Sequence, residues 1–344
     1  MTLQKTLLAF GLLCSAFTAR AQQTPLFFDV NADARTAGLG GRMNAGLEAD
    51  LHVAAFNPAF LDCSDMGGWT VDYVNYFGST TLGTVNMVLS AEGNRTHAVG
   101  ARFVTYGSLA EYDASGVSTG GAFSAGDVVL QTSTSWVVDA GAGHRMTLGV
   151  TGWAGTRAWD RDVALLTGLD AAARGVWPER QFSWGLAWTG RGRQRGLGSR
   201  LPSGRIGGNL QLGLAKSFAN APFSLYLQAV ELQTWDLAPA GTYDPVIDPL
   251  TGASSSPMAF PFGDALMRHI LVGTELDLGE SLAIQFGYDY RRRQEMKSNG
   301  MPGTNGLSLG VLFGVKRLKF RIARNTYHFA GASTHLGLRF DLNS

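Results

Sequence analysis

The chain has 344 residues, of which 45% are hydrophobic and 16% are charged, and its formal net charge is +1. A near-neutral charge excludes a strongly basic nucleic-acid-binding surface, and an average soluble domain carries more charge, about 25% of its residues. No apolar run reaches the roughly 18 residues of a membrane-spanning helix. Hydrophobic side chains are instead spread over short segments, as in a β-barrel with an apolar outer face.

The first residues have the pattern of an export signal. Lys5 precedes the apolar run 6–14, and the small-residue site Ala19-Arg20-Ala21 precedes Gln22. This pattern predicts a secretory signal peptide, residues 1–21, cleaved after Ala21. Cys63 is then the single cysteine of the mature chain, so no intramolecular disulfide is expected. We expect a buried thiol there, with intermolecular pairing as the alternative.

Residues 22–68 show no strand-like alternation. They contain Arg35, the glycine pair Gly40 and Gly41, and then Asn57 followed by Pro58. Pro58 has no backbone N–H to donate, which argues against a central strand. Irregular backbone at membrane depth is tolerated only where protein encloses it. We therefore interpret residues 22–68 as an N-terminal plug inside a barrel formed by residues 69–344.

From residue 69 onward, segments of about ten residues alternate between apolar and small or polar side chains, as at Leu282, Ile284, Phe286 and Tyr288. About ten residues is the length of a tilted strand that crosses a membrane. The sequence thus predicts an all-β fold, a transmembrane antiparallel β-barrel of about fourteen strands. The predicted strands are residues 69–77, 82–90, 96–106, 127–138, 145–156, 162–170, 181–190, 206–217, 222–231, 267–277, 281–290, 306–315, 318–325 and 334–342.

The lengths of the connections support an even strand number. If the last strand returns to the periplasm, short connections at 91–95, 140–144, 171–180, 218–221, 278–280 and 316–317 share that side. The longer connections 107–126, 191–205, 232–266 and 291–305 then all face outward. Single-chain bacterial barrels show this segregation of short periplasmic turns from long outer loops. It places the chain in the cell outer membrane, with both mature termini on the periplasmic side.

No motif of catalytic chemistry is present. The sequence contains no phosphate-binding loop, no HExxH zinc motif and no GxSxG nucleophile elbow, and its six histidines are scattered. We predict no enzymatic activity, no cofactor and no metal site. Charged residues within the predicted strands, such as Asp72, Arg102 and Glu275, are expected to face the lumen, because a charge on the lipid face is costly.

Two arginine groups stand in the predicted outer loops. They comprise Arg191, Arg193, Arg195, Arg200 and Arg205 in the first, and Arg291, Arg292 and Arg293 in the second. Guanidinium groups pair well with phosphate, so lipopolysaccharide or a protein partner is the functional interpretation, and solvated loop charge is the alternative. The proline-rich loop 232–266 is either a docking lid for a partner or a mobile tip. Aromatic residues such as Tyr73, Trp153, Trp184 and Trp188 are expected to form membrane-interface girdles.

The order of several short motifs resembles one family. Residues 34–41 and 56–59 are similar to the start of the PorV and PorQ proteins, which are fourteen-stranded, FadL-like outer-membrane barrels of the type IX secretion system of Bacteroidetes. Residues 268–293 and 320–331 resemble the PorQ branch, with Arg268-His269-Ile270 and Tyr327-His328-Phe329 among the matching positions. The similarity extends from about residue 26 to the end, but residues 158–266 match only in strand rhythm.

This resemblance implies a non-enzymatic component of a cell-surface attachment complex. A PorQ-type barrel would anchor a PorZ-like surface protein that engages lipopolysaccharide and works with a PorU-like sortase and a PorV-like barrel. Two alternatives remain open. The first is a PorV-type shuttle that binds the C-terminal signal domains of secreted proteins. The second is a FadL-like channel for hydrophobic small molecules, in which the plug holds a ligand and a strand kink releases it sideways into the membrane. No nucleic acid is expected as a partner.

Overall fold

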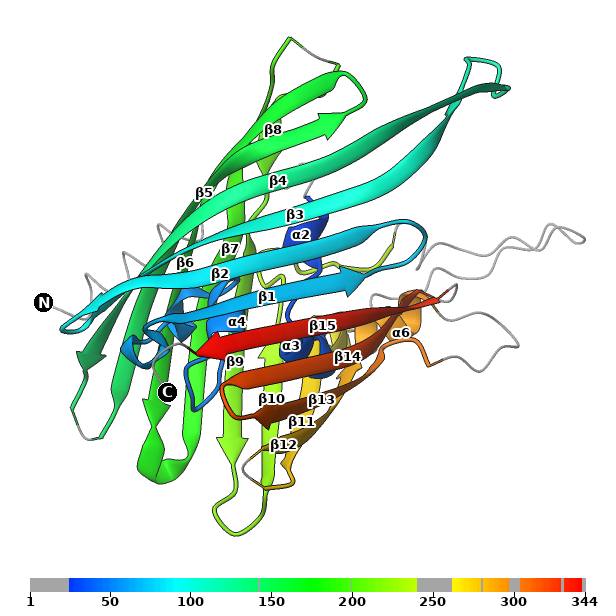
Figure 1. Ribbon diagram of the computed structural model, residues 1–344. Coiled ribbons are helices and arrows are strands. Elements are labelled where there is room, and N and C mark those ends of the chain that lie inside the picture. The colour runs from blue at the N-terminus through cyan, green and yellow to red at the C-terminus, as the bar shows by residue number, and fades with distance from the viewer. Residues whose placement is uncertain are drawn as a thin grey trace, which may run out of the picture.

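The computed structural model describes residues 25–141, 143–198, 200–239, 262–279, 281–296, 304–328 and 331–341, so the predicted signal peptide lies outside the described residues. Antiparallel strands form a closed barrel (Figure 1). The first strand pairs with the last, with Trp69 opposite Phe340. Strands β8 and β9 both pair with β7, so they fill one position that is interrupted at residues 207–208. The closed ring therefore has the 14 strands that the sequence predicts.

The bounds of the elements follow. The strands are β1 (Gly68–Asn75), β2 (Thr81–Glu92), β3 (Arg95–Tyr112), β4 (Ser118–Asp139), β5 (Arg145–Trp159), β6 (Asp162–Trp177), β7 (Phe182–Gly196), β8 (Gly204–Ile206), β9 (Asn209–Ser217), β10 (Phe223–Ala229), β11 (Ile270–Asp277), β12 (Leu282–Asp289), β13 (Leu307–Val315), β14 (Leu318–His328) and β15 (Gly331–Asp341). The helices are α2 (Leu26–Asp29), α3 (Ala34–Gly38), α4 (Leu51–Ala54), α5 (Phe262–His269) and α6 (Tyr290–Glu295), with 3-10 turns η1 (Pro58–Phe60), η2 (Cys63–Asp65) and η3 (Pro178–Arg180).

The side chains of the strands are distributed inside out relative to a soluble protein. On β1, Val71 and Tyr73 are 36% and 42% exposed, whereas Thr70 and Asp72 between them are 0% and 1% exposed. The same alternation continues around the ring, so the outer face is apolar and the inner face is polar. Such a surface is stable only in contact with lipid, which makes the chain a transmembrane barrel of the outer-membrane type.

Aromatic ring contacts lie at the end of the barrel where the connections are tight. Ring contacts join Trp69 to Phe340 at 5.6 Å and Phe313 to Phe320 at 5.1 Å. Further contacts at the same end join Trp177 to Phe182 and Phe218 to Phe223. These contacts flank the tight connections, and we call this end the turn end and the opposite one the loop end. A band of aromatic rings at a barrel end marks a membrane interface.

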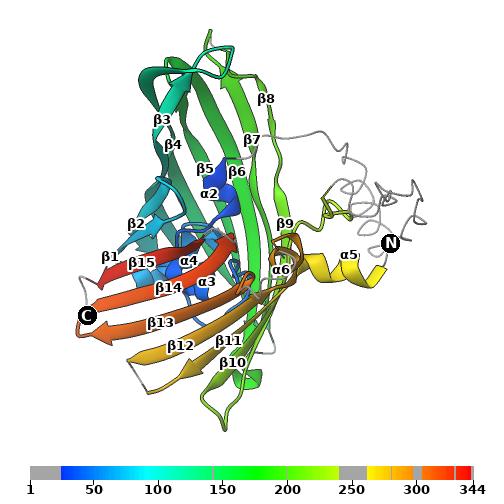
Figure 2. The same ribbon diagram turned by 90° about the vertical axis from the view of Figure 1, so that its right-hand side faces the viewer.

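The two halves of the ring differ in height. Strands β3 to β8 project beyond β9 to β15 at the loop end (Figure 2). The predicted loop 107–126 is mostly strand, because β3 and β4 continue to Tyr112 and Ser118. The predicted loop 191–205 is largely the β7–β8 hairpin. At the opposite, turn end, strand β6 continues through the predicted turn 171–180 as far as Trp177. Water wets both faces of projecting hairpins, so no apolar alternation marks them in the sequence.

Helices replace predicted strand or loop at two places near the loop end. Residues 262–269 form α5, so the predicted strand 267–277 begins only at Ile270, and α6 opens the predicted loop 291–305. Two smaller predictions were wrong. Cys63 is exposed rather than buried, and Trp153 is a buried, inward-facing side chain that does not belong to a girdle. Among the described residues, no helix is long and apolar enough to cross a membrane.

The N-terminal segment, residues 25–67, lies within the ring of strands, where α2, α3 and α4 are visible in both views (Figures 1 and 2). It supplies many of the buried apolar side chains of the interior, including Phe27, Leu39, Leu51 and Phe60. The predicted mature N-terminus, Gln22, lies outside the described residues. Helix α2 sits near α6 at the loop end, whereas Asp341 ends β15 at the turn end.

Candidate functional site

The N-terminal segment is built from helical turns that are each too short to be stable alone. Asp33, Asp50, Asn57 and Asp62 precede α3, α4, η1 and η2, and the side chain of each accepts a hydrogen bond from a backbone amide of the turn it begins. Such caps satisfy amides that lack a partner within the helix. These caps determine only the local direction of the backbone at each turn. The segment as a whole therefore depends on contacts with the barrel for its stability.

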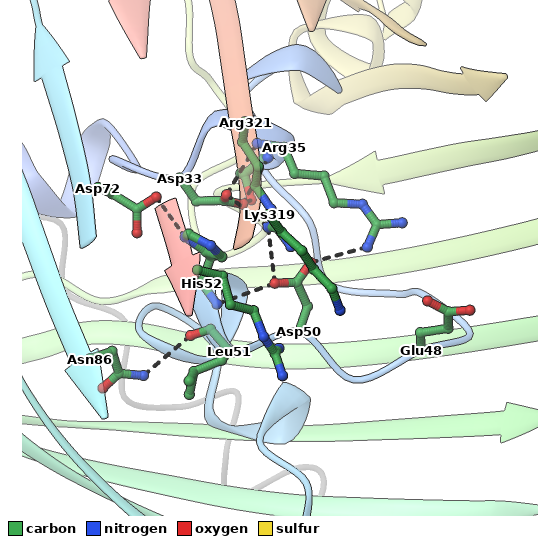
Figure 3. Close-up of polar contacts among 12 residues, drawn as sticks. Asp33, Arg35, Glu48, Asp50, Leu51, His52, Asp72, Asn86, Lys319 and Arg321 are labelled. Atoms are coloured by element: carbon green, nitrogen blue, oxygen red, sulfur yellow. Dashed lines mark hydrogen bonds and ion pairs between the residues drawn. The ribbon is translucent and has the colours of Figure 1, made fainter. Parts of the chain in front are cut away.

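Arg35 joins the segment to the barrel wall. Its Nε and Nη2 donate to both carboxylate oxygens of Glu275 on β11, at 3.0 and 2.6 Å. Its Nη1 donates to Asp50 at 3.0 Å, as Figure 3 shows. The Arg35 side chain is 13% exposed and its two partners are almost fully buried. A forked contact of this kind, shielded from water, is among the stronger polar contacts in proteins.

A second arginine completes the network from β14. Arg321 Nη1 lies 3.2 Å from Asp33 and 3.0 Å from Asp50, so both carboxylates of the segment face it (Figure 3). Asp50 thus bridges Arg35 and Arg321. Because each charge has a partner of opposite sign, burial of the cluster is tolerated, whereas removal of one partner would leave a buried charge unpaired.

His52 provides a further contact, to β1. Its Nδ1 lies 2.7 Å from Asp72, and both side chains are fully buried (Figure 3). Burial lowers the pKa of His52 to about 3, so the imidazole is neutral. Asp33, His52 and Asp72 could each offer one atom to a cation. An ion there would have to displace Arg321 from Asp33, so these residues fit hydrogen-bonded pairs better than a metal centre.

A separate cluster fixes the wall near α2. Asp170 on β6 accepts hydrogen bonds from Trp153 at 3.1 Å and from the backbone amide of Gly190 at 2.6 Å, and it lies 3.4 Å from Arg102. The Arg102 guanidinium also lies over the rings of Phe28 and Phe56 of the N-terminal segment, at 5.6 and 4.9 Å. The cluster therefore connects four strands, β3, β5, β6 and β7, to the segment.

The barrel wall is irregular beside this cluster. The pairing of β6 with β7 shifts between Leu169 and Ala171, and Gly190 on β7 has a φ of +75° that favours glycine. The next position around the ring is the interruption between β8 and β9. A Cβ atom on Gly190 would lie 3.2 Å from the ring of Phe28. Helix α2 thus covers the irregular wall from inside.

A small cavity separates the segment from this part of the wall. Its lining includes the rings of Phe27, Phe28 and Phe56 and the guanidinium groups of Arg42 and Arg102. Arg42 donates to Asn31 at 2.9 Å and to the carbonyl of Phe28 at 2.7 Å. Neutral polar side chains complete the lining together with Met43, and they are Asn31, Asn44, Asn57, Thr189 and Gln211.

The glycines and Pro58 singled out in the N-terminal segment lie close to the wall, and Asn57 lies beside them in the chain. Gly40 and Gly41 have φ values of +101° and +112°, and Gly40 packs on the backbone of Tyr288. Asn57 caps η1 and donates to Asn44 at 3.3 Å. Pro58 faces Gly149 on β5, where a Cβ atom would lie 2.4 Å from its carbonyl carbon.

The eight arginines separate into two groups by position. The exposed arginines of the β7–β8 hairpin are Arg191, Arg193, Arg195 and Arg205. Arg200 lies in the turn of this hairpin and pairs with Asp162 at 3.0 Å. Those of α6 make internal contacts instead. Arg291 pairs with Glu231 and Glu295, Arg292 lies 4.0 Å from the centre of the Tyr327 ring, and the backbone and Cβ of Arg293 pack near Gly306.

Sequence reasoning missed Asp33, Asp50, His52, Asp170 and Arg321 as anchoring residues. Asp72, Arg102 and Glu275 were expected to face the lumen, and all three are buried there. The same rule, that a charge at an inward position of a strand has a buried partner, could have identified Asp170 and Arg321. Nothing in the sequence marks the aspartates of the segment beyond their capping positions.

No family model matches the sequence, and neither does any curated protein. Several solved outer-membrane proteins resemble the barrel. The Ralstonia pickettii toluene transporter TbuX is 11% identical, with 91% of this chain and 98% of that chain covered and a TM-score of 0.47. A Pseudomonas aeruginosa FadL homologue is 13% identical, with 94% and 100% covered and a TM-score of 0.45. The Pseudomonas putida toluene transporter TodX is 11% identical, with 88% and 95% covered and a TM-score of 0.43.

Proposed function

We propose that the chain is a non-enzymatic, gated outer-membrane channel for small hydrophobic molecules, and that the N-terminal segment is its plug. The observation that carries the proposal is the irregular wall at β6–β9, which is covered from inside by Phe28 and adjoins a small cavity lined by aromatic, cationic and neutral polar residues. A hydrophobic molecule gains nothing from a water-filled pore, because its favourable destination is the lipid. An exit through the barrel wall would deliver such a molecule directly into the lipid.

The plug joins the barrel covalently where Gly67 leads into β1. Its polar links to the wall include the contacts of Arg35, Arg321, His52 and Arg102. Phe27 and Phe28 also pack in one apolar cluster with wall residues such as Leu82, so movement of the plug has to break both kinds of contact. Displacement of the segment, α2 included, would uncover Gly190 and the interruption at residues 207–208.

Entry of a hydrophobic dye tests the proposal. Cells that express the protein should admit 1-N-phenylnaphthylamine, which an intact outer membrane excludes, faster than cells without it. The variant Phe28→Ala, which removes the ring beside Gly190, should admit it faster still. Phe123→Ala is the matched control, because Phe123 contacts Trp159 on the projecting hairpins and not the plug. Equal dye entry with and without the protein would contradict the proposal.

A second candidate is the attachment role that the PorQ resemblance implies, with the PorV-type shuttle as its variant. The supporting observation is the height of β3 to β8, whose hairpins offer a surface for a protein partner at the loop end (Figure 2). The predicted docking loop 232–266 lies largely outside the described residues. Affinity purification from native outer membranes distinguishes the candidates. A PorZ-like protein with a PorU-like sortase and a PorV-like barrel supports anchoring, and cargo signal domains support the shuttle.

A further inference from the structure

The outer face of β7 changes its chemistry abruptly at Gly190. On the turn-end side of Gly190, Leu186 is exposed and Trp188 is half-buried, and both face outward. Beyond it, where the pairing with β6 has shifted by one residue, Arg191, Arg193 and Arg195 are exposed, whereas Gln194 is buried. The apolar face that contacts lipid therefore continues directly into a row of arginines. A lipid-facing strand that ends in this way places its cations at the membrane interface.

The arginine row continues onto β8, and within the part of the chain that the structure describes none of its four members pairs with an acid. Arg193 stands directly opposite Arg205 in the pairing of β7 with β8, and both side chains are exposed. Like charges at opposite positions of a strand pair destabilise it. Asp162, on the neighbouring strand β6, pairs with Arg200. Arg191 lies 4.7 Å from the ring of Trp188. A bound anion would relieve the repulsion between Arg193 and Arg205.

Leucines line the neighbouring strand at the same level. Leu169 on β6 is opposite Arg191 and Leu165 is opposite Arg195, and their exposed fractions are 68% and 38%. Residues directly opposite each other in an antiparallel pair project from the same face. The surface therefore presents a row of cations beside a row of exposed apolar side chains.

We propose that this face of β6–β8 binds the phosphorylated, multiply acylated glycolipid of the outer leaflet. Arg191, Arg193, Arg195 and Arg205 contact its phosphates, and Leu165 and Leu169 contact its acyl chains. Forked guanidinium groups match phosphate geometry, and the adjacent leucines favour a lipid over a soluble anion. The inference is independent of the channel proposal, because it concerns the outer surface and not the lumen.

Native mass spectrometry of the full-length protein in detergent tests the site, with diphosphorylated lipid A as the probe. The variant Arg193→Gln/Arg195→Gln/Arg205→Gln should bind it at least about tenfold more weakly. The matched control is Arg95→Gln/Arg180→Gln/Arg317→Gln, which removes the same charge from exposed positions at the turn end and should bind as the wild type does. Heat-modifiable migration establishes that each variant is folded.

Further probes separate lipid recognition from simple charge attraction. Phosphatidylglycerol and inorganic phosphate should bind at least tenfold more weakly than lipid A. A triple lysine variant at positions 193, 195 and 205 should bind with intermediate strength, because it keeps the charge and loses the fork. Equal binding of lipid A by the glutamine variant and the wild type would overturn the proposal. Equal binding of phosphatidylglycerol and lipid A by the wild type would also overturn it.

Discussion

Substitution of Arg35 by methionine should release the N-terminal segment from the barrel wall without unfolding the barrel. Methionine has a similar length and no charge, so the change removes the hydrogen bonds to Glu275 and Asp50 and keeps much of the packing. The carboxylates that remain are 5% and 1% exposed, and only Asp50 keeps a second arginine. Glu275 would then be a buried charge without a cation.

The expected magnitude follows from burial. Loss of one partner from a buried ion pair costs about 3–5 kcal/mol, and the remaining contact of Asp50 with Arg321 favours the lower value. About 3 kcal/mol corresponds to roughly a hundredfold larger population of the released segment. Strand pairing does not involve Arg35, so the free energy of unfolding of the barrel should change little.

Hydrogen–deuterium exchange measures this release directly. The amides of Ala37, Leu39 and Gly41 donate within the segment, so their exchange reports its local opening. Their exchange should accelerate by about two orders of magnitude in Arg35→Met, while that of β2 should not change. The control is Arg145→Met, which removes the contact of a 48% exposed arginine with Asp62 and should cost at most about 1 kcal/mol.

A double variant separates charge from packing. Arg35→Met/Glu275→Gln removes the unpaired charge and keeps an acceptor for Gln285, so it should recover most of the lost protection. Unchanged exchange in Arg35→Met would refute the reasoning that this arginine holds the segment. Faster exchange in the double variant than in Arg35→Met would refute the assignment of the effect to an unpaired Glu275.

Three further outcomes are expected. Gly185→Ala should weaken docking of the segment by about 1–3 kcal/mol, because its Cβ would lie 1.7 Å from the carbonyl oxygen of Asn44. Hydrogen exchange at residues 42–46 measures this effect. Gly152→Ala is the control and should not weaken docking, because its Cβ would lie 3.8 Å from the nearest neighbouring atom. The pKa of His52 lies at about 3 in the docked segment, below its usual 6.5, so the released segment binds more protons below pH 6.5. Docking in the wild type should therefore weaken relative to His52→Gln by about 1.4 kcal/mol per pH unit from pH 6.5 towards 3, as seen in the pH dependence of exchange. Mass spectrometry of the mature protein should find Gln22 as the first residue, and an intact N-terminus would contradict cleavage after Ala21.

The strands that contact lipid could be predicted from sequence because the membrane imposes a period of two on them. Residues 282–290 show this plainly, and the structure places β12 at Leu282–Asp289. The projecting hairpins gave no such signal, since Arg191, Gly192 and Arg193 follow one another with no apolar face. Helix α5 was missed because the sequence before Ile270 offers the apolar residues of either a strand or an amphipathic helix.

The anchoring contacts could be predicted only in part. A charge within a predicted strand identifies a lumen residue, as it did for Glu275, but it does not identify the partner. Arg35 and Glu275 are 240 positions apart, and their contact depends on the path of the whole segment inside the ring. The capping aspartates of that segment resemble any surface turn in sequence, and their burial becomes evident only once the barrel encloses them.

A reversible cross-link between the segment and the wall tests most directly whether the segment gates the channel. A Cβ atom on Gly273 would lie 3.0 Å from the Cβ of Leu39, so Leu39→Cys/Gly273→Cys needs a shift of about half an ångström to reach disulfide geometry. Cys63→Ser in the same chain removes the competing thiol, and each single cysteine variant serves as a control. The account predicts that the oxidised double variant admits the hydrophobic dye no faster than cells without the protein, and that a reductant restores entry. Dye entry at the wild-type rate through the fully cross-linked protein would contradict it.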